Sequence, residues 1–165
     1  LYVQASLNGG KVYERLALFL EEICSGLPEE CLSGMRGNGY DLAQRLLRQK
    51  ESTDLSVYPS LYGVRGRKKR FGVIENITEK NFHPSDLVRA YVAGMAAELH
   101  DMYGGFPDGL CGGRRKIIAS GNGIRKNELL RQEIERQFGM PLYLSGLAEE
   151  AAAGAACLAG EWSLF

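Results

Sequence analysis

The sequence has few of the residues that would place it in a special class of protein. Its cysteines form no Cys-x-x-Cys pair and no cluster with histidine, which argues against a disulfide scaffold or a structural zinc site; they are Cys24, Cys31, Cys111 and Cys157. No apolar run reaches the roughly 18 residues that a membrane span needs, and no signal peptide is recognisable. We therefore expect reduced thiols, no membrane partner and a cytoplasmic location.

An excess of charge of one sign is also lacking. Twenty Lys and Arg residues balance twenty Asp and Glu residues, and 45% hydrophobic with 24% charged residues is usual for a globular protein. Five basic residues do gather in 65–70. We interpret them as a solvated loop, with a phosphate or nucleic-acid patch as the alternative. Because no aromatic residues are interleaved for base stacking, we expect no nucleic-acid partner.

The chain has no initiator methionine and no polar leader. It begins with "LYVQASLNGG", in which residues 1–7 are rich in strand formers and Asn8-Gly9-Gly10 is a turn signal. The 165 residues suffice for one domain with a real core. We expect this sequence to be a piece of a longer protein.

Apolar periodicity predicts alternating helices and short strands. Helices are predicted at 12–23, 41–49, 84–103, 127–138 and 148–160, and further short strands at 116–120 and 142–144. This alternation favours an α/β layer architecture. The Ala- and Gly-rich helix 148–160 predicts close packing against a neighbour. Its first acids, Glu149 and Glu150, suit the helix dipole rather than a catalytic pair, and structural roles are expected for His83 and His100.

A glycine-rich segment follows the predicted strand 116–120. Glycines between a strand and a helix let a ligand approach the backbone near a helix N-terminus, at the sheet edge where α/β proteins bind ligands. Ser120-Gly121-Asn122-Gly123 has this form, as does Asn8-Gly9-Gly10, so the two segments could share one site. The full Gly-x-Gly-x-x-Gly fingerprint is missing because residue 126 is lysine, and a structural tight turn is the alternative.

Three ordered blocks of the sequence resemble one protein family. They are "ASLNGGKVYERLALFL", the stretch from "VYPSLYGVRG" through "LVRAYVAG", and "IIASGNGIRKNELLRQEIERQFGMPLYLSGLAEEAAAGAACLA". In order and separation they are similar to the C-terminal lobe of FGGY carbohydrate kinases, most of all to the sedoheptulokinase branch. The last block is the most specific of the three.

The resemblance implies a fold and an activity. The fold is α/β, a partial ribonuclease H-like C-terminal lobe of the actin and sugar-kinase superfamily, and residues 1–165 would be the nucleotide-binding lobe without the N-terminal sugar-binding lobe. The parent would use ATP and Mg²⁺ to phosphorylate a ketose such as sedoheptulose. Its partners would be the nucleotide and, through the other lobe, the sugar; a homodimer stays open. The chain alone would be inactive.

The resemblance also implies which residues bind the cofactor. Ser120, Gly121, Asn122 and Gly123 would line the adenosine side, Lys126 and Asn127 would lie near the base, and Gly9, Gly10, Val12 and Tyr13 would form the opposite wall. Catalytic residues, including the base, and the second phosphate-binding hairpin would lie outside this chain, and no metal ligand is identified in it.

Two alternatives remain at this point. The parent could be another FGGY kinase, acting on xylulose, ribulose or glycerol, or the chain could be a non-catalytic interaction domain that has lost the nucleotide. Retained glycines at 8–10 and 120–123 favour binding. On this basis Gly121→Val is expected to abolish nucleotide binding without unfolding the lobe.

Overall fold

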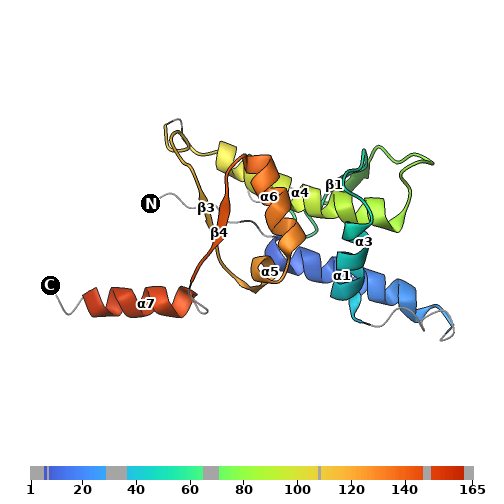
Figure 1. Cartoon of the computed structure of the whole chain (residues 1–165), viewed down its shortest axis with the longest axis horizontal. Coiled ribbons are helices and arrows are strands. Elements are labelled where there is room, and N and C mark those ends of the chain that lie inside the picture. Colours follow the sequence, from blue (N-terminus) through green and yellow to red (C-terminus); the bar gives the residue numbers. More distant parts are fainter. Residues whose placement is uncertain are drawn as a thin grey trace.

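The computed structural model describes residues 6, 8–28, 37–64, 71–107, 109–146 and 150–161. The predicted strand at 1–7, the basic residues 65–70 and Glu149 therefore lie outside, or almost wholly outside, the described residues. Within them, helices and short strands alternate in the second half of the chain, as the sequence predicts, and the arrangement is the α/β type expected (Figure 1).

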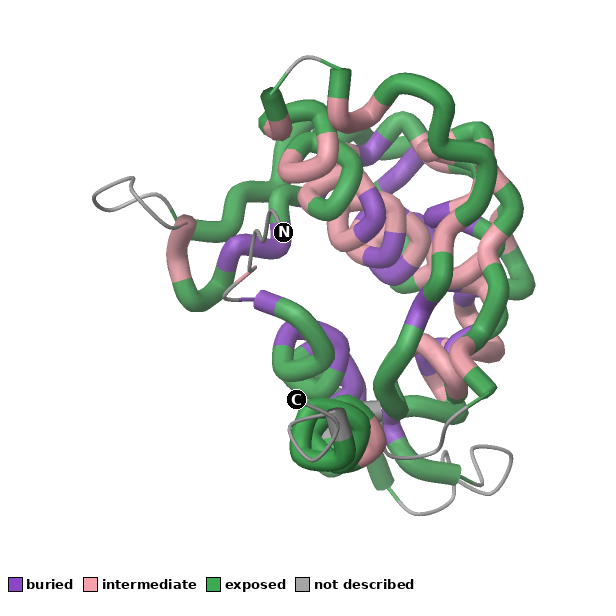
Figure 2. The backbone as a smooth tube through the Cα atoms, turned by 90° about the vertical axis from the view of Figure 1, so that its left-hand side faces the viewer, coloured by how far each residue is buried: buried purple, intermediate pink, exposed green. Residues whose placement is uncertain are grey.

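Four helices build the core: α1 (Gly9–Ser25), α3 (Gly39–Arg48), α4 (Pro84–Gly104) and α6 (Glu128–Phe138). Their buried apolar residues form one cluster, which includes Tyr13, Leu16, Leu20, Leu47, Val88, Val92, Leu130 and Ile134. Figure 2 shows the buried positions gathered where the helices face one another. Burial of these side chains supplies the main stabilisation of the fold.

Very close backbone approaches fix how the helices meet. A Cβ added to Gly39 would lie 2.0 Å from the Ala17 carbonyl oxygen, so α3 begins against the backbone of α1. A Cβ added to Gly94 would lie 1.9 Å from the Val57 carbonyl oxygen, which seats α4 on strand β1 (Ser56–Tyr58). Only glycine allows either contact.

The strands form two small sheets. Strand β1 pairs antiparallel with β2 (Val73–Glu75), and β3 (Ile117–Ala119) pairs parallel with β4 (Leu142–Leu144). The chain passes from β3 to β4 through the short helix α5 (Asn122–Arg125) and α6, which makes a βαβ unit. Strands β3 and β4 run side by side in Figure 1.

Two turn expectations from the sequence are wrong. Gly9 and Gly10 form the first turn of α1 instead of a turn before it, and Asn122 and Gly123 belong to α5. Glycine can take helical angles as readily as turn angles, so local sequence does not decide between them. Asn127 is the N-cap of α6, its side chain accepting from the Leu130 N–H, rather than the first residue of that helix.

Close packing of the last helix is also not found. Helix α7 (Glu150–Glu161) lies apart from the other helices (Figure 1), and most of its described side chains are exposed. A Cβ added to Gly154 or Gly160 would meet nothing within 4 Å. Small residues permit a close approach but do not create one, because a packing partner must also be present.

Candidate functional site

The two glycine segments predicted to share a site lie side by side. A Cβ added to Gly123 would stand 3.8 Å from the Gly10 Cα atom, so the start of α5 touches the start of α1. Gly9, Gly10, Gly121 and Gly123 are all exposed, and nothing lies within 4 Å of a Cβ added to the first three. A ligand can therefore reach bare backbone from both helices at one place.

Backbone geometry explains why Gly121 is glycine. Its φ is +93°, a left-handed conformation that other residues adopt only with strain. Through this conformation the chain turns from β3 into α5. Gly121→Val would therefore add backbone strain to its effect on a ligand, and Gly123, which has no positive φ, is the cleaner position for a test.

The first turn of α1 has no side-chain cap. Asn8 occupies the N-cap position but forms no cap hydrogen bond. Its Nδ2 instead donates to the Glu98 Oε1 (2.9 Å) and the Gly63 carbonyl (3.1 Å), and its Oδ1 accepts from the Tyr62 N–H (3.1 Å). The first N–H groups of a helix have no partner within the helix. The start of α1 can thus offer these N–H groups, and the positive end of the helix dipole, to an anion.

Two arginines hold the glycine segment after β3 in place. Arg125 donates through Nη2 to the Ser145 carbonyl (2.8 Å), which ties α5 to the end of β4. Arg131 donates through Nη1 to the carbonyls of Ile124 and Arg125 (2.8 and 2.7 Å) and so stabilises the C-terminal end of α5. The segment is pre-formed, which lowers the entropic cost of binding a ligand there.

Below this surface, a polar chain links three helices. Gln44 on α3 donates through Nε2 to the Tyr13 hydroxyl (3.0 Å) on α1 and to the Asn127 Oδ1 (2.9 Å) at the start of α6. Burial raises the pKa of the Tyr13 hydroxyl, so it stays protonated. The buried Asn127 side chain also reaches the Tyr13 hydroxyl, so the three side chains form one polar cluster.

The structure divides the predicted site residues into two groups. Exposed positions at the glycine contact are Gly9, Gly10, Ser120, Gly121, Asn122, Gly123 and Lys126. Val12, Tyr13 and Asn127 are buried, with 0%, 7% and 1% exposure, so in this structure they support the site from beneath instead of presenting a wall. Binding itself stays a prediction for all ten residues. Sequence reasoning did not identify Gln44, because no local pattern shows that its amide reaches two other helices.

One apolar pocket lies elsewhere, between α1 and the β1–β2 hairpin. Its volume is about 320 Å³, and Leu16, Phe19, Val57, Tyr58, Ile74 and Tyr91 are among its lining residues. Among the described residues of its lining, Arg15 alone is charged. The described lining is mainly apolar and does not suit a sugar or a phosphate, so we do not take this pocket as the candidate site.

Neither a metal-binding cluster nor a membrane-spanning helix is found in the part of the chain that the structure describes. There, no three His, Cys, Asp or Glu side chains gather closely enough to hold a metal ion, and none of the helices could cross a membrane. No disulfide joins the described cysteines, which are Cys24, Cys111 and Cys157; Cys31 is not among the described residues. His100 packs edge-on against Phe138, with 5.1 Å between the ring centroids, which is a structural role.

Comparison with known proteins identifies relatives along nearly the whole chain. Residues 9–161 match the FGGY family of carbohydrate kinases, C-terminal domain. The chain is 29% identical to the sedoheptulokinase of Mus musculus and 28% identical to that of Homo sapiens, in each case over 156 residues, 94% of this chain and 32% of the relative. It thus spans about a third of the length of these relatives.

A solved structure shows the same fold. The crystal structure of xylulose kinase from Rhodospirillum rubrum matches with a TM-score of 0.62 and 16% identity, over 82% of this chain and 25% of that chain. This likeness confirms the sugar-kinase type of lobe, and the family match covers both glycine segments that meet in the structure apart from Asn8. The chain belongs to the FGGY family of carbohydrate kinases, as a C-terminal domain similar to that of sedoheptulokinases.

Proposed function

We propose that this chain is the nucleotide-binding part of an ATP-dependent sugar kinase that phosphorylates a ketose such as sedoheptulose. The observation that carries the proposal is the contact between Gly123 and Gly10, which brings two exposed glycine segments to one place. Membership of the FGGY family supplies the class of reaction. Residues 1–165 then form the C-terminal lobe, and the sugar-binding lobe belongs to the rest of the parent protein.

The residues at the contact fit the ribose and phosphate part of a nucleotide. Glycines leave room for the sugar, and the uncapped start of α1 offers N–H groups and the positive end of its dipole to a phosphate. Exposed lysines follow both segments, Lys11 directly after Gly10 and Lys126 after α5. Positive charge and bare backbone together are the usual means of holding phosphate groups in proteins.

Phosphoryl transfer depends on positioning and on neutralising charge, and Mg²⁺ bound to the phosphates supplies most of that neutralisation. No cluster of three acidic or metal-binding side chains exists in the described residues. We therefore assign this chain the role of orienting the adenosine end of ATP, and we place the catalytic base and the metal contacts in other parts of the parent. On this division the chain alone would be inactive, and we further propose a cytoplasmic parent.

The proposal is tested by a thermal unfolding scan of the chain with and without millimolar MgADP. A ligand that binds only the native state must raise the melting temperature. We expect a rise for the wild type and none for Gly123→Val, whose side chain fills the contact with Gly10. No rise with the wild type, in the chain or in the full-length parent, would contradict nucleotide binding.

The sugar is tested with the full-length parent. The curated relatives that match over 94% of this chain are sedoheptulokinases, which favours sedoheptulose. The likeness to xylulose kinase, at 16% identity, concerns the fold alone. Rates of ADP release with sedoheptulose, xylulose, ribulose and glycerol would rank the substrates. A higher kcat/KM for any of the other three would assign the parent to that branch.

A further inference from the structure

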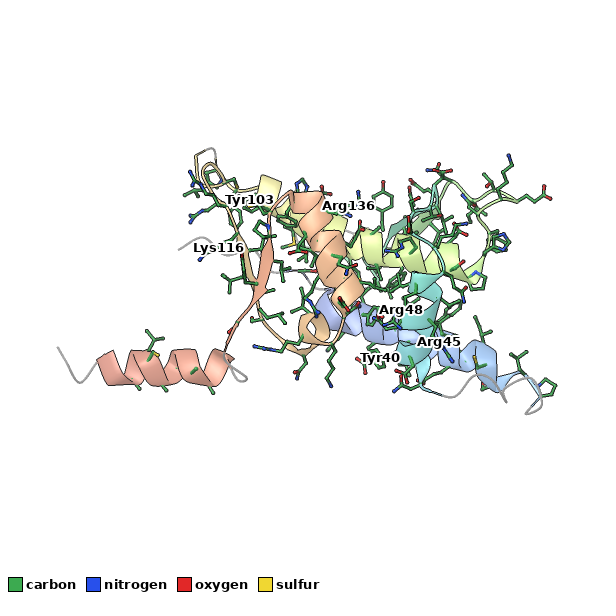
Figure 3. The ribbon with its side chains drawn as sticks, in the orientation of Figure 1. Tyr40, Arg45, Arg48, Tyr103, Lys116 and Arg136 are labelled. Carbon is green, nitrogen blue, oxygen red and sulfur yellow. The ribbon has the colours of Figure 1, made fainter. Side chains whose placement is uncertain are left out.

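An exposed aromatic side chain lies beside the proposed nucleotide site. Tyr40 is the second residue of α3, and 42% of its surface is exposed. Its ring centroid lies 5.8 Å from that of Tyr13, with the ring planes tilted by 48°. Tyr13 in turn lies three residues, about one helical turn, after Gly10 on α1. Figure 3 shows Tyr40 on the lower side of the view, at the start of α3.

The backbone that carries Tyr40 is held firmly. Asn38 and Asp41 form a reciprocal capping box at the start of α3. Gly39 lies against the Ala17 carbonyl and donates its N–H to the Glu21 Oε1 (2.7 Å). Tyr40 follows immediately, so its ring is presented from a rigid turn. A pre-organised ring loses little conformational entropy when a ligand stacks on it.

Hydrogen-bonding groups lie one turn farther along the same helix. Gln44, four residues after Tyr40, contacts the Tyr13 hydroxyl and the Asn127 Oδ1. Asn127 is 1% exposed and its side chain also reaches the Tyr13 hydroxyl, so these polar groups support the Tyr13–Tyr40 pair from beneath.

A purine base is suited to an exposed aromatic ring next to an amide. It has a flat π face that stacks on the ring, and its edge carries donors and acceptors that an amide can meet. We propose that Tyr40 is the platform on which the base of the nucleotide stacks, with the partly exposed Gln44 amide one turn farther along α3 toward the edge of the base; this inference rests on the nucleotide site proposed above. Tyr40 thus sets the preference for a purine, while the glycine contact holds the ribose and phosphate.

Calorimetric titration of MgADP into the wild type, Tyr40→Leu and Tyr40→Phe tests this inference. Leucine keeps apolar bulk for packing on Tyr13 but removes the π face, whereas phenylalanine keeps it. Base–aromatic stacking predicts that Tyr40→Leu weakens ADP binding about tenfold, and that Tyr40→Phe stays within about twofold of the wild type. Tyr58→Leu, at a similarly exposed tyrosine of β1, is the matched control and should leave ADP affinity unchanged.

A second readout separates stacking from general packing. Because purines stack more strongly than pyrimidines, the ratio of ADP to CDP affinity should fall in Tyr40→Leu and stay unchanged in Tyr40→Phe. Melting scans without nucleotide show whether each variant is folded. If wild-type ADP binding is abolished by Gly123→Val but unaffected by Tyr40→Leu, the nucleotide site stands and the role of Tyr40 is wrong. If the wild type does not bind ADP at all, both proposals are wrong.

Discussion

Gly123 at the start of α5 lies against Gly10 at the start of α1, and a Cβ added to Gly123 would stand 3.8 Å from the Gly10 Cα atom. The two residues are 113 positions apart in sequence. Their contact joins the segment after β3 to the first turn of α1. Two glycine-rich segments that are far apart in sequence therefore form one surface.

Gly10→Ala should stabilise the protein but weaken nucleotide binding. Gly10 is in a helix, has no positive φ and has no atom within 4 Å of an added Cβ, so alanine should raise the free energy of unfolding by about 0.5–1 kcal/mol. The new methyl group occupies space that the ligand needs to reach the backbone. Loss of one charge-assisted hydrogen bond, about 1.5 kcal/mol, corresponds to about tenfold weaker ADP binding.

Gly154→Ala is the control for Gly10→Ala. Gly154 lies inside α7, and a Cβ added to it would meet nothing within 4 Å. The variant should therefore give a similar gain in stability with unchanged ADP affinity. Urea denaturation and calorimetric titration of both variants provide the two measurements. Equal ADP affinity in the wild type and Gly10→Ala would argue that no ligand approaches α1 at this position.

Gly94→Ala should destabilise the fold. A Cβ at this position would lie 1.9 Å from the Val57 carbonyl oxygen and 2.9 Å from the Pro59 Cδ, so α4 and β1 must move apart. Such overpacking typically costs about 1–3 kcal/mol. Gly104→Ala, in the last turn of α4, is the matched control. A Cβ added to Gly104 would meet nothing within 4 Å, so this variant should be nearly neutral. A midpoint of urea unfolding shared by both variants would contradict the close approach.

Asn8→Ala should destabilise the protein by about 2–3 kcal/mol, because its buried side chain makes hydrogen bonds to Glu98, Gly63 and Tyr62 that water cannot easily replace.

Asn8→Asp keeps the acceptor for the Tyr62 N–H but places a carboxylate beside that of Glu98. We expect the loss of stability relative to the wild type to be larger at pH 7 than near pH 4, where one of the two adjacent carboxyls can be protonated. Chemical denaturation at both pH values measures the difference, and a pH-independent cost would contradict this arrangement.

Asp86 should make stability depend on acidic pH. Burial acts to raise the pKa of this carboxyl, but hydrogen bonds from Thr53 (2.6 Å) and Lys50, with the nearby Lys50 charge (3.0 Å), lower the pKa below its usual value. Because the folded-state pKa is below the unfolded one, ionised Asp86 stabilises the fold above about pH 4, and this contribution is lost as the pH falls through the folded-state pKa.

The difference in unfolding free energy between the wild type and Asp86→Asn should therefore be constant from about pH 7 to 5 and shrink below about pH 4. Urea denaturation across this range measures it. Asp101→Asn, at an exposed position of α4, is the control for the loss of a negative charge. A difference that grows on acidification would show that Asp86 is not held ionised by these partners.

The positions of the long helices could be predicted from sequence because their apolar residues repeat at helical spacing. Helix 84–103 is observed as Pro84–Gly104, and the short strands at 116–120 and 142–144 as β3 and β4. Turns were less predictable, since Gly9, Gly10 and Gly123 are helical where a turn was expected. Glycine allows many conformations, and the surrounding structure selects one of them.

The sequence by itself determined the helices, the α/β class, the family resemblance and the two glycine segments, because these depend on local spacing and on the order of motifs. Tertiary structure decided that Gly123 meets Gly10, that Asn8 turns away from α1 to Glu98, and that Gln44 links Tyr13 with Asn127. These contacts join residues between 31 and 113 positions apart. They depend on how whole helices pack, which no short stretch of sequence encodes.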